Sequence, residues 1–213
     1  MGALAAFDAL IYINLGHRLD RKRLLLQELE CLEVPAEKIH RLDAVHDILN
    51  GHRGCAQSHC LALELAEKNQ WNNVLILEDD MHFTAEKEEV EQEVVRFFQV
   101  FKNAWDVFFL ATNVFESHPT DHPAIARVVC AQCSHAYAVN RSYFHTLKSC
   151  FYEAYLAMQE DETFVDSLFK AIDQRWKELQ PVGRWYIGKV LGQQRRSYSD
   201  IEHVIRKRDH GVL

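Results

Sequence analysis

The sequence lacks any apolar run that approaches the roughly 18 residues needed to cross a membrane as a helix. The N-terminus also lacks the basic segment of a secretory signal peptide, because its first charged residue is Asp8. Only 4 prolines and 8 glycines occur in 213 residues, which excludes a collagen-like or low-complexity chain. We therefore expect a globular protein located in the cytoplasm, with no transmembrane segment.

The sequence has fewer basic than acidic residues: 24 Lys and Arg against 31 Asp and Glu, which gives a net charge of −7. This balance argues against a nucleic-acid partner, which would need a broad basic face. A nucleotide is still compatible, because a local basic cluster or a metal ion can meet its phosphates. The length of the chain predicts a single domain over residues 1–213.

The six cysteines lie inside patterned apolar segments of a chain that shows no secretory signal. We therefore expect reduced thiols rather than disulfides. Cys130 and Cys133 form a lone CxxC pair, for which Cys55 and Cys60 are poorly matched partners. The cysteine pattern alone therefore does not predict a zinc site.

Short β-rich apolar runs alternate with longer amphipathic ones, which predicts an α/β fold: a mixed, mainly parallel sheet flanked by helices. The expected strands are 9–14, 40–45, 73–77, 106–111, 128–139 and 184–190, and the expected helices are 19–32, 55–69, 84–102, 141–158 and 162–179. Residues 112–123 contain two prolines and are expected to form a loop. Ligands in such folds bind at the carboxyl ends of strands, here from Asn14, Asp43 and Glu78 onward.

Three adjacent carboxylates, Glu78, Asp79 and Asp80, end the expected strand at 73–77. On an extended backbone Glu78 and Asp80 point to one face and Asp79 to the other. Their mutual repulsion would be relieved by a divalent cation, which in turn binds substrate phosphates. The alternative is a solvated strand end or a helix N-cap.

Basic residues follow the first strand, between Asn14 and Arg23, at the start of an expected helix. A helix N-terminus and Arg side chains can together bind a phosphate, but taken alone the cluster favours the simpler interpretation of solvated helix charges. Further along, Gly51 and Gly54 precede a helix and permit close backbone approach to a ligand. Their spacing matches neither a Walker loop nor a GxGxxG loop.

Taken in order, these motifs resemble glycosyltransferase family 25, which includes bacterial lipooligosaccharide and procollagen galactosyltransferases. The resemblance extends over about residues 9 to 201. The segments that carry it are Ile11–Leu15 with Asp20–Arg21, Gly54–Cys55, Ser58–His59, Leu77–Asp80, Ala136–Arg141, Val165–Asp166, Gln194 and Ser199–Ile201. The chain departs from the family at Gly16–His17, where the family usually has Asp-Arg, and at His52, where it has an acid.

The resemblance implies a GT-A-like (Rossmann-like) fold and a metal-dependent, inverting transfer of a sugar from a nucleotide-sugar, usually a UDP-sugar. The implied cation is Mn²⁺ or Mg²⁺, and the implied acceptor is a hydroxyl of a glycan or glycoprotein, through which the protein could lie against a membrane. The implied donor-binding residues are Asn14, Arg18, Asp20, Arg21, Asp43, Ser58, His59, Glu78, Asp79, Gln194 and Ser199. The implied metal ligands are Asp80, Glu78 and His203.

An inverting transfer also needs a carboxylate that takes the proton of the acceptor hydroxyl, and it must differ from the metal ligands. The resemblance favours Asp166, with Asp161 and Glu162 as rivals. The alternative is that Asp161 caps a helix and Asp166 lies on its polar face. Two other functions stay open, namely a metal-dependent nucleotidyltransferase or phosphohydrolase and a non-catalytic sugar-nucleotide-binding module.

Overall fold

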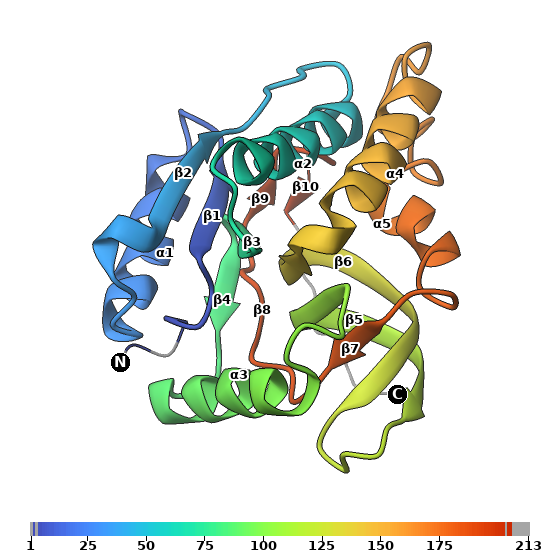
Figure 1. Cartoon of the computed structure of the whole chain (residues 1–213). Helices are drawn as coiled ribbons and strands as arrows, with labels where there is room; N and C mark the ends of the chain where they lie inside the picture. The colour runs from blue at the N-terminus through green and yellow to red at the C-terminus, as the bar shows by residue number, and fades with distance from the viewer. Residues whose placement is uncertain (1, 3, 203, 206–213) are drawn as a thin grey trace.

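The computed structural model describes residues 2, 4–202 and 204–205 (Figure 1). A central sheet of six strands carries helices on both of its faces. The strands are β1 (Ala9–Asn14), β2 (Ile39–Asp43), β3 (Asn73–Glu78), β5 (Val107–Pro119), β6 (Ala126–Asn140) and β7 (Trp185–Ile187). The helices are α1 (Leu19–Cys31), α2 (Gly51–Lys68), α3 (Lys87–Phe101), α4 (Phe144–Ala157) and the short α5 (Ile172–Arg175).

The sheet has the order β2-β1-β3-β6-β5-β7, and every strand except β6 runs in the same direction. This confirms the predicted mixed, mainly parallel sheet flanked by helices. Because β1 and β3 are parallel neighbours, with Ile13 opposite Glu78, their carboxyl ends lie together. The residues that follow these two strands therefore meet at one edge of the sheet.

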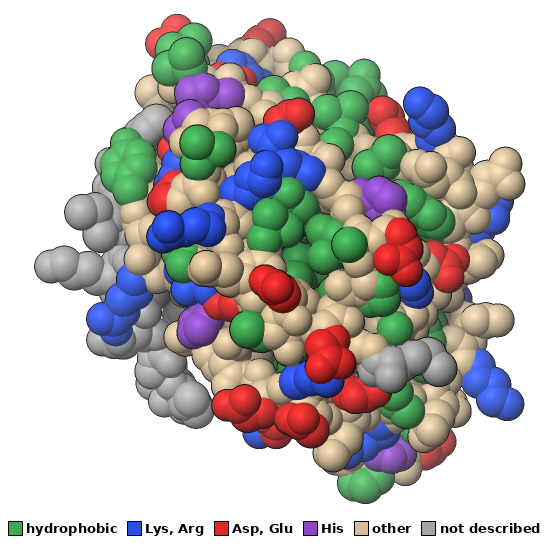
Figure 2. All heavy atoms as spheres, turned by 90° about the vertical axis from the view of Figure 1, so that its left-hand side faces the viewer, with side chains coloured by type: hydrophobic (Ala, Val, Ile, Leu, Met, Phe, Trp, Pro, Cys, Tyr) green, Lys and Arg blue, Asp and Glu red, His purple; other side chains and the backbone are tan. Residues whose placement is uncertain are grey.

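The core is divided into two layers by the sheet. In β1, Ile11 and Ile13 pack against α2 and α4 on one face, whereas Leu10 and Tyr12 pack against α1 and α3 on the other. Every residue of this strand is buried, as expected for a parallel strand covered on both sides. On the side of the molecule that carries α1 and β2, acidic, basic and hydrophobic side chains are interspersed (Figure 2).

Two of the predicted elements are wrong. Residues 162–179 form turns with only α5 and a 3-10 turn at Trp176–Glu178, rather than one helix. Residues 112–119, expected in a loop, continue β5 and pair with the first half of β6 as a long hairpin. The alternative that Asp161 caps a helix and Asp166 lies on its face is therefore also excluded.

The C-terminal part of the chain returns across the sheet edge in short strands. β4 (Met81–Phe83) pairs with β8 (Gly192–Gln194), and β9 (Tyr198–Ser199) pairs with β10 (Val204–Ile205). Figure 1 shows this segment running past the carboxyl ends of β1 and β3. It thereby forms the outer side of the site described below.

No disulfide joins any of the six cysteines, all of which belong to the described residues. Within those residues, none of the helices combines the length and apolarity that crossing a bilayer requires. His203, one of the implied metal ligands, lies outside the described residues.

Candidate active site

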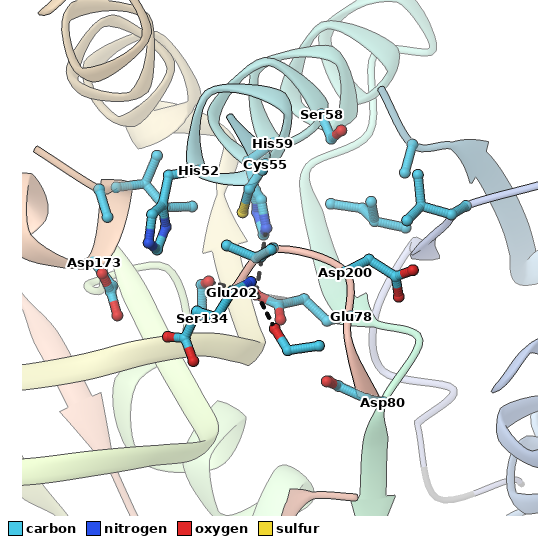
Figure 3. A pocket seen from close by; sticks show the side chains of 18 of the residues that line it. His52, Cys55, Ser58, His59, Glu78, Asp80, Ser134, Asp173, Asp200 and Glu202 are labelled. Atoms are coloured by element: carbon cyan, nitrogen blue, oxygen red, sulfur yellow. Dashed lines mark hydrogen bonds and ion pairs between the residues drawn. The ribbon is translucent and has the colours of Figure 1, made fainter. Parts of the chain in front are cut away.

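A cavity of about 190 Å³ lies where β1 and β3 end, between the start of α2 and the C-terminal segment (Figure 3). Eight of the residues implied by the resemblance line it: Arg21, Ser58, His59, Glu78, Asp79, Asp80, Gln194 and Ser199. They come from six different elements or turns, so the fold brings together motifs that are far apart in the sequence.

The three consecutive carboxylates have different partners. Glu78, the last residue of β3, accepts a hydrogen bond of 2.5 Å from the Ser134 hydroxyl and lies 3.5 Å from His59 Nε2. Burial opposes the charged form of Glu78, but the neighbouring His59 and Ser134 hold its pKa below the usual range. Gln194 on β8 approaches the other oxygen of Glu78 at 3.4 Å.

Asp79 is held by the basic turn after β1. Its carboxylate accepts hydrogen bonds from Asn14 Nδ2 at 2.7 Å and from Arg21 Nη1 at 2.9 Å. Burial nevertheless raises the pKa of Asp79 above its usual value. Asp80 lies 3.4 Å from the same Arg21 guanidinium and, with Glu78, points into the cavity (Figure 3).

Arg18 and Arg21 tie the C-terminal segment to the start of α1. Both guanidinium groups donate to the backbone oxygen of Tyr198, and Arg18 also pairs with Asp200. Arg18 binds Asp20 too, and this hydrogen bond lowers the pKa of Asp20 to about 2. Of the basic cluster predicted to meet phosphates, Arg21 lines the cavity, whereas Arg18 and Asp20 support the segment beside it.

The start of α2 forms a second side of the cavity. Ser58 donates to the Gly54 carbonyl and accepts from Val45 N at 2.8 Å, so its hydroxyl fixes the loop that follows β2. A Cβ on Gly54 would lie 2.6 Å from the Val45 oxygen, and one on Gly51 would lie 2.4 Å from Ile201 Cα. The two glycines therefore allow other segments of the backbone to pack closely against α2. The sequence pattern instead predicted that a ligand would approach the backbone at these glycines.

The predicted base and its rivals lie apart from the cavity lining. Asp166 accepts from the backbone N and hydroxyl of Thr163 in a local turn. Asp161 binds Ser167 at 2.7 Å and Lys170 at 2.5 Å, and Glu162 is exposed. Asp43, implied in donor binding, is also exposed.

Asp173, seven residues after Asp166, is the acid of this same segment that does line the cavity. Its carboxylate accepts a hydrogen bond from Cys133 N at 3.1 Å. Sequence reasoning also missed several other lining residues, namely Asp47, His52, Cys55, Ser134, Asp200 and Glu202. Asp200 and Cys55 both belong to segments that carried the resemblance, whereas Asp173 had no recognisable local pattern.

Solved structures with similar folds support the architecture. At 12% identity and a TM-score of 0.52, the chain is similar to a protein described as mannose-1-phosphate geranyltransferase from Thermus thermophilus, with 87% of this chain and 74% of that one covered. At 10% identity and a TM-score of 0.50, it is similar to a glycosyltransferase involved in glycosylation of the major capsid of PBCV-1, with 85% and 81% covered. No curated protein matches the sequence.

The model of glycosyltransferase family 25 (LPS biosynthesis protein) matches residues 36–160, which is more than half of the chain. The matched region contains the start of α2 and the three carboxylates at the end of β3. The protein therefore belongs to glycosyltransferase family 25 and is a glycosyltransferase.

Proposed function

We propose that this transferase moves a sugar from a UDP-sugar to an acceptor hydroxyl on a glycan or glycoprotein, with inversion at the sugar carbon and with help from Mn²⁺ or Mg²⁺. The donor would bind in the cavity at the ends of β1 and β3. Family membership supports the class of reaction. The position of the cavity, at the carboxyl ends of parallel strands, is where folds of this kind bind nucleotides.

The charge of the cavity is the observation that carries the proposed metal dependence. Among the described residues that line it, Arg21 is the one Arg or Lys side chain, and seven are acids: Asp47, Glu78, Asp79, Asp80, Asp173, Asp200 and Glu202. A diphosphate is repelled by such a surface unless a divalent cation comes with it. An acidic cavity thus favours binding of an anionic donor as a metal complex.

The carboxylate oxygens present fit a hard cation such as Mn²⁺ or Mg²⁺. Asp79 is committed to Asn14 and Arg21, and Glu78 faces His59 and Ser134, so Asp80 would be the principal ligand, with donor phosphates completing the set. When bound, the cation would offset the charge that develops on the departing diphosphate. Arg21, 3.4 Å from Asp80, would lie beside the same phosphates.

The acceptor hydroxyl needs a base within reach of the sugar carbon. The resemblance implies Asp166, but Asp173 is placed at the cavity, and we propose it as the base. Its carboxylate would take the hydroxyl proton as the new glycosidic bond forms and the bond to the diphosphate breaks. The products are the glycosylated acceptor and free UDP.

The direct test incubates the purified chain with Mn²⁺, a panel of UDP- and GDP-sugars and glycan acceptors, and measures release of nucleoside diphosphate. The proposal expects one UDP-sugar to be turned over and EDTA to abolish the release. Release of pyrophosphate from a nucleoside triphosphate and sugar phosphate would instead identify a nucleotidyltransferase. Absence of metal-dependent turnover or binding with every donor would contradict the proposal.

A further inference from the structure

We propose that Cys55, His59 and Glu78 form a second cation site in the same cavity, selective for Zn²⁺ and similar thiophilic ions. One ligand atom from each residue lies within 4.8 Å of the others: a thiol sulfur, an imidazole nitrogen and a carboxylate oxygen. Zinc bound by three such side chains, with a fourth position open, is a well-known arrangement in proteins. Mn²⁺ and Mg²⁺ prefer oxygen ligands, so this set would discriminate against the cation proposed at Asp80.

Helix α2 places two of the three ligands side by side. Cys55 and His59 are four residues apart on α2, so their side chains lie one turn apart on the same face. In Figure 3 the Cys55 sulfur lies beside the His59 ring, and both face the end of β3, where Glu78 stands. The sheet and the helix therefore hold the three ligands close together, and no loop has to close to form the site.

The pair formed by His59 and Glu78 has the spacing of two ligands on one metal. His59 Nε2 and Glu78 Oε1 are 3.5 Å apart, and Nε2 is buried and makes no hydrogen bond within the described part of the chain. Nitrogen and oxygen ligands bound tetrahedrally at roughly 2.0–2.2 Å are about 3.3–3.6 Å apart. His59 and Glu78 could thus bind one Zn²⁺ ion almost without moving, whereas the Cys55 sulfur would have to move slightly closer to them.

The residues behind the ligands orient them as a metal site requires. His59 Nδ1 is 2.7 Å from the Tyr137 hydroxyl, and the Ser134 hydroxyl donates to Glu78 at 2.5 Å. A ligating imidazole commonly uses its second nitrogen in such a hydrogen bond, which fixes the ring. When a cation binds, Nδ1 would donate to Tyr137, and the neutral ring would offer its Nε2 lone pair to the cation beside the Glu78 carboxylate.

Occupancy by Zn²⁺ would have a functional consequence that rests on the proposed function. Glu78 is adjacent in sequence to Asp79 and Asp80, and all three ligands of the site line the cavity. A Zn²⁺ ion held there would compete with the Mn²⁺ complex of the donor. Zinc is therefore expected to inhibit the transferase, and removal of the Cys55 thiol to relieve that inhibition.

Metal binding alone tests the site, without any donor. The purified full-length chain, reduced and metal-free, is titrated with Co²⁺, and thiolate-to-cobalt charge-transfer absorption is recorded. Zn²⁺ affinity is then measured by competition with a chromogenic chelator. We expect one cobalt–thiolate site per chain, displaced by Zn²⁺, and at least a tenfold loss of Zn²⁺ affinity in Cys55→Ser.

Cys133→Ser is the matched control for affinity, because Cys133 is also a thiol of the cavity lining but lies outside the cluster. It should bind Zn²⁺ as the wild type does. Wild-type protein without a cobalt–thiolate band, or equal Zn²⁺ affinity in Cys55→Ser, would overturn the proposal. Circular dichroism of each variant shows whether it is folded, and Glu78→Gln provides a second variant that should weaken binding. Because no UDP-sugar is present, failure here leaves the proposed transferase activity unaffected.

Discussion

The two sides of the cavity are built in different ways. The inner wall consists of the ends of β1 and β3 and the start of α2, whose backbones are held by the sheet and by a capped helix. The outer wall, residues 168–174 and 194–202, consists mainly of turns and two-stranded pairings. Its position depends on Arg18 and Arg21, at the start of α1, which donate to its backbone.

The two walls therefore contribute different parts of the site. The inner wall supplies Glu78 and Asp80 from fixed strand ends, as preorganised binding requires. The outer wall supplies Asp173 and covers the cavity through contacts that single substitutions can remove. Substitutions in the two walls should therefore have separable effects on catalysis and on stability.

The largest expected effect is on catalysis, from Asp173→Asn in the outer wall. Loss of a general base costs typically about 10²–10⁴-fold in rate. We expect a fall of that size in kcat, with the affinity for UDP in the presence of Mn²⁺ retained. Steady-state kinetics and calorimetry measure the two quantities.

Asp166→Asn is the matched comparison, since Asp166 belongs to the same segment but bonds to Thr163 instead of lining the cavity. If Asp166→Asn removed the activity and Asp173→Asn did not, the base would be Asp166, as the family resemblance implies. Such a result would also mean that the outer wall rearranges when substrates bind.

Arg21→Ala should give the next largest effect, because this side chain joins the two walls. It donates to Asp79 on one side and to Ser197 and Tyr198 on the other. Removing one partner of a buried ion pair leaves an uncompensated charge and costs about 3 kcal/mol. Urea denaturation should show a loss of this size, and a loss below about 1 kcal/mol would contradict the assigned role.

Gly51→Ala should push the outer wall away from α2. The added Cβ would lie 2.4 Å from Ile201 Cα, and such overpacking costs about 1–3 kcal/mol. Gly16→Ala is the control, because its nearest atom would be Arg41 Nη2 at 4.0 Å. Equal free energies of unfolding for the two variants would show that the close approach is not needed.

The smallest expected effect is a pH dependence of the outer wall through Asp200. Burial favours the neutral acid, but hydrogen bonds from His17 and Arg18 outweigh it and lower the pKa below 3.8. A lowered folded-state pKa stabilises the fold above the unfolded pKa, and this contribution is lost as the pH falls through the folded value. Asp200→Asn should therefore be less stable than the wild type at pH 7, by about 1 kcal/mol, with a smaller difference below pH 3.8. Denaturation curves at the two pH values measure this, and a constant difference would contradict it.

The inner wall was predictable from the sequence, because the sequence patterns that indicate its elements are local. The buried runs at 9–14 and 73–77 gave strands at the expected places, and the parallel arrangement then placed Asn14 and Glu78 at one edge. Asp80 was found because three adjacent acids at a strand end are unusual. The start of α2 was placed four residues late, since Asn50 rather than the glycines caps the helix.

The outer wall was not predictable, because long-range contacts determine it. Residues 162–179 were expected to form a helix, yet Thr163 and Asp166 bond within a local turn. Ser167 donates to Asp161 and accepts from Asn50. Arg21 meets Ser197 across 176 positions of sequence, which no local pattern reports. Asp173 lines the cavity from α5, the short helix that follows these turns.

We propose that the inner wall binds the donor as a metal complex through Asp80. Isothermal titration of UDP into the wild type and Asp80→Asn, each with Mn²⁺ and with EDTA, tests it most directly. We expect wild-type affinity for UDP to fall at least tenfold when Mn²⁺ is removed, and Asp80→Asn to behave in Mn²⁺ as the wild type does in EDTA. Equal binding of UDP by the wild type in Mn²⁺ and in EDTA, or wild-type affinity in Asp80→Asn, would contradict it.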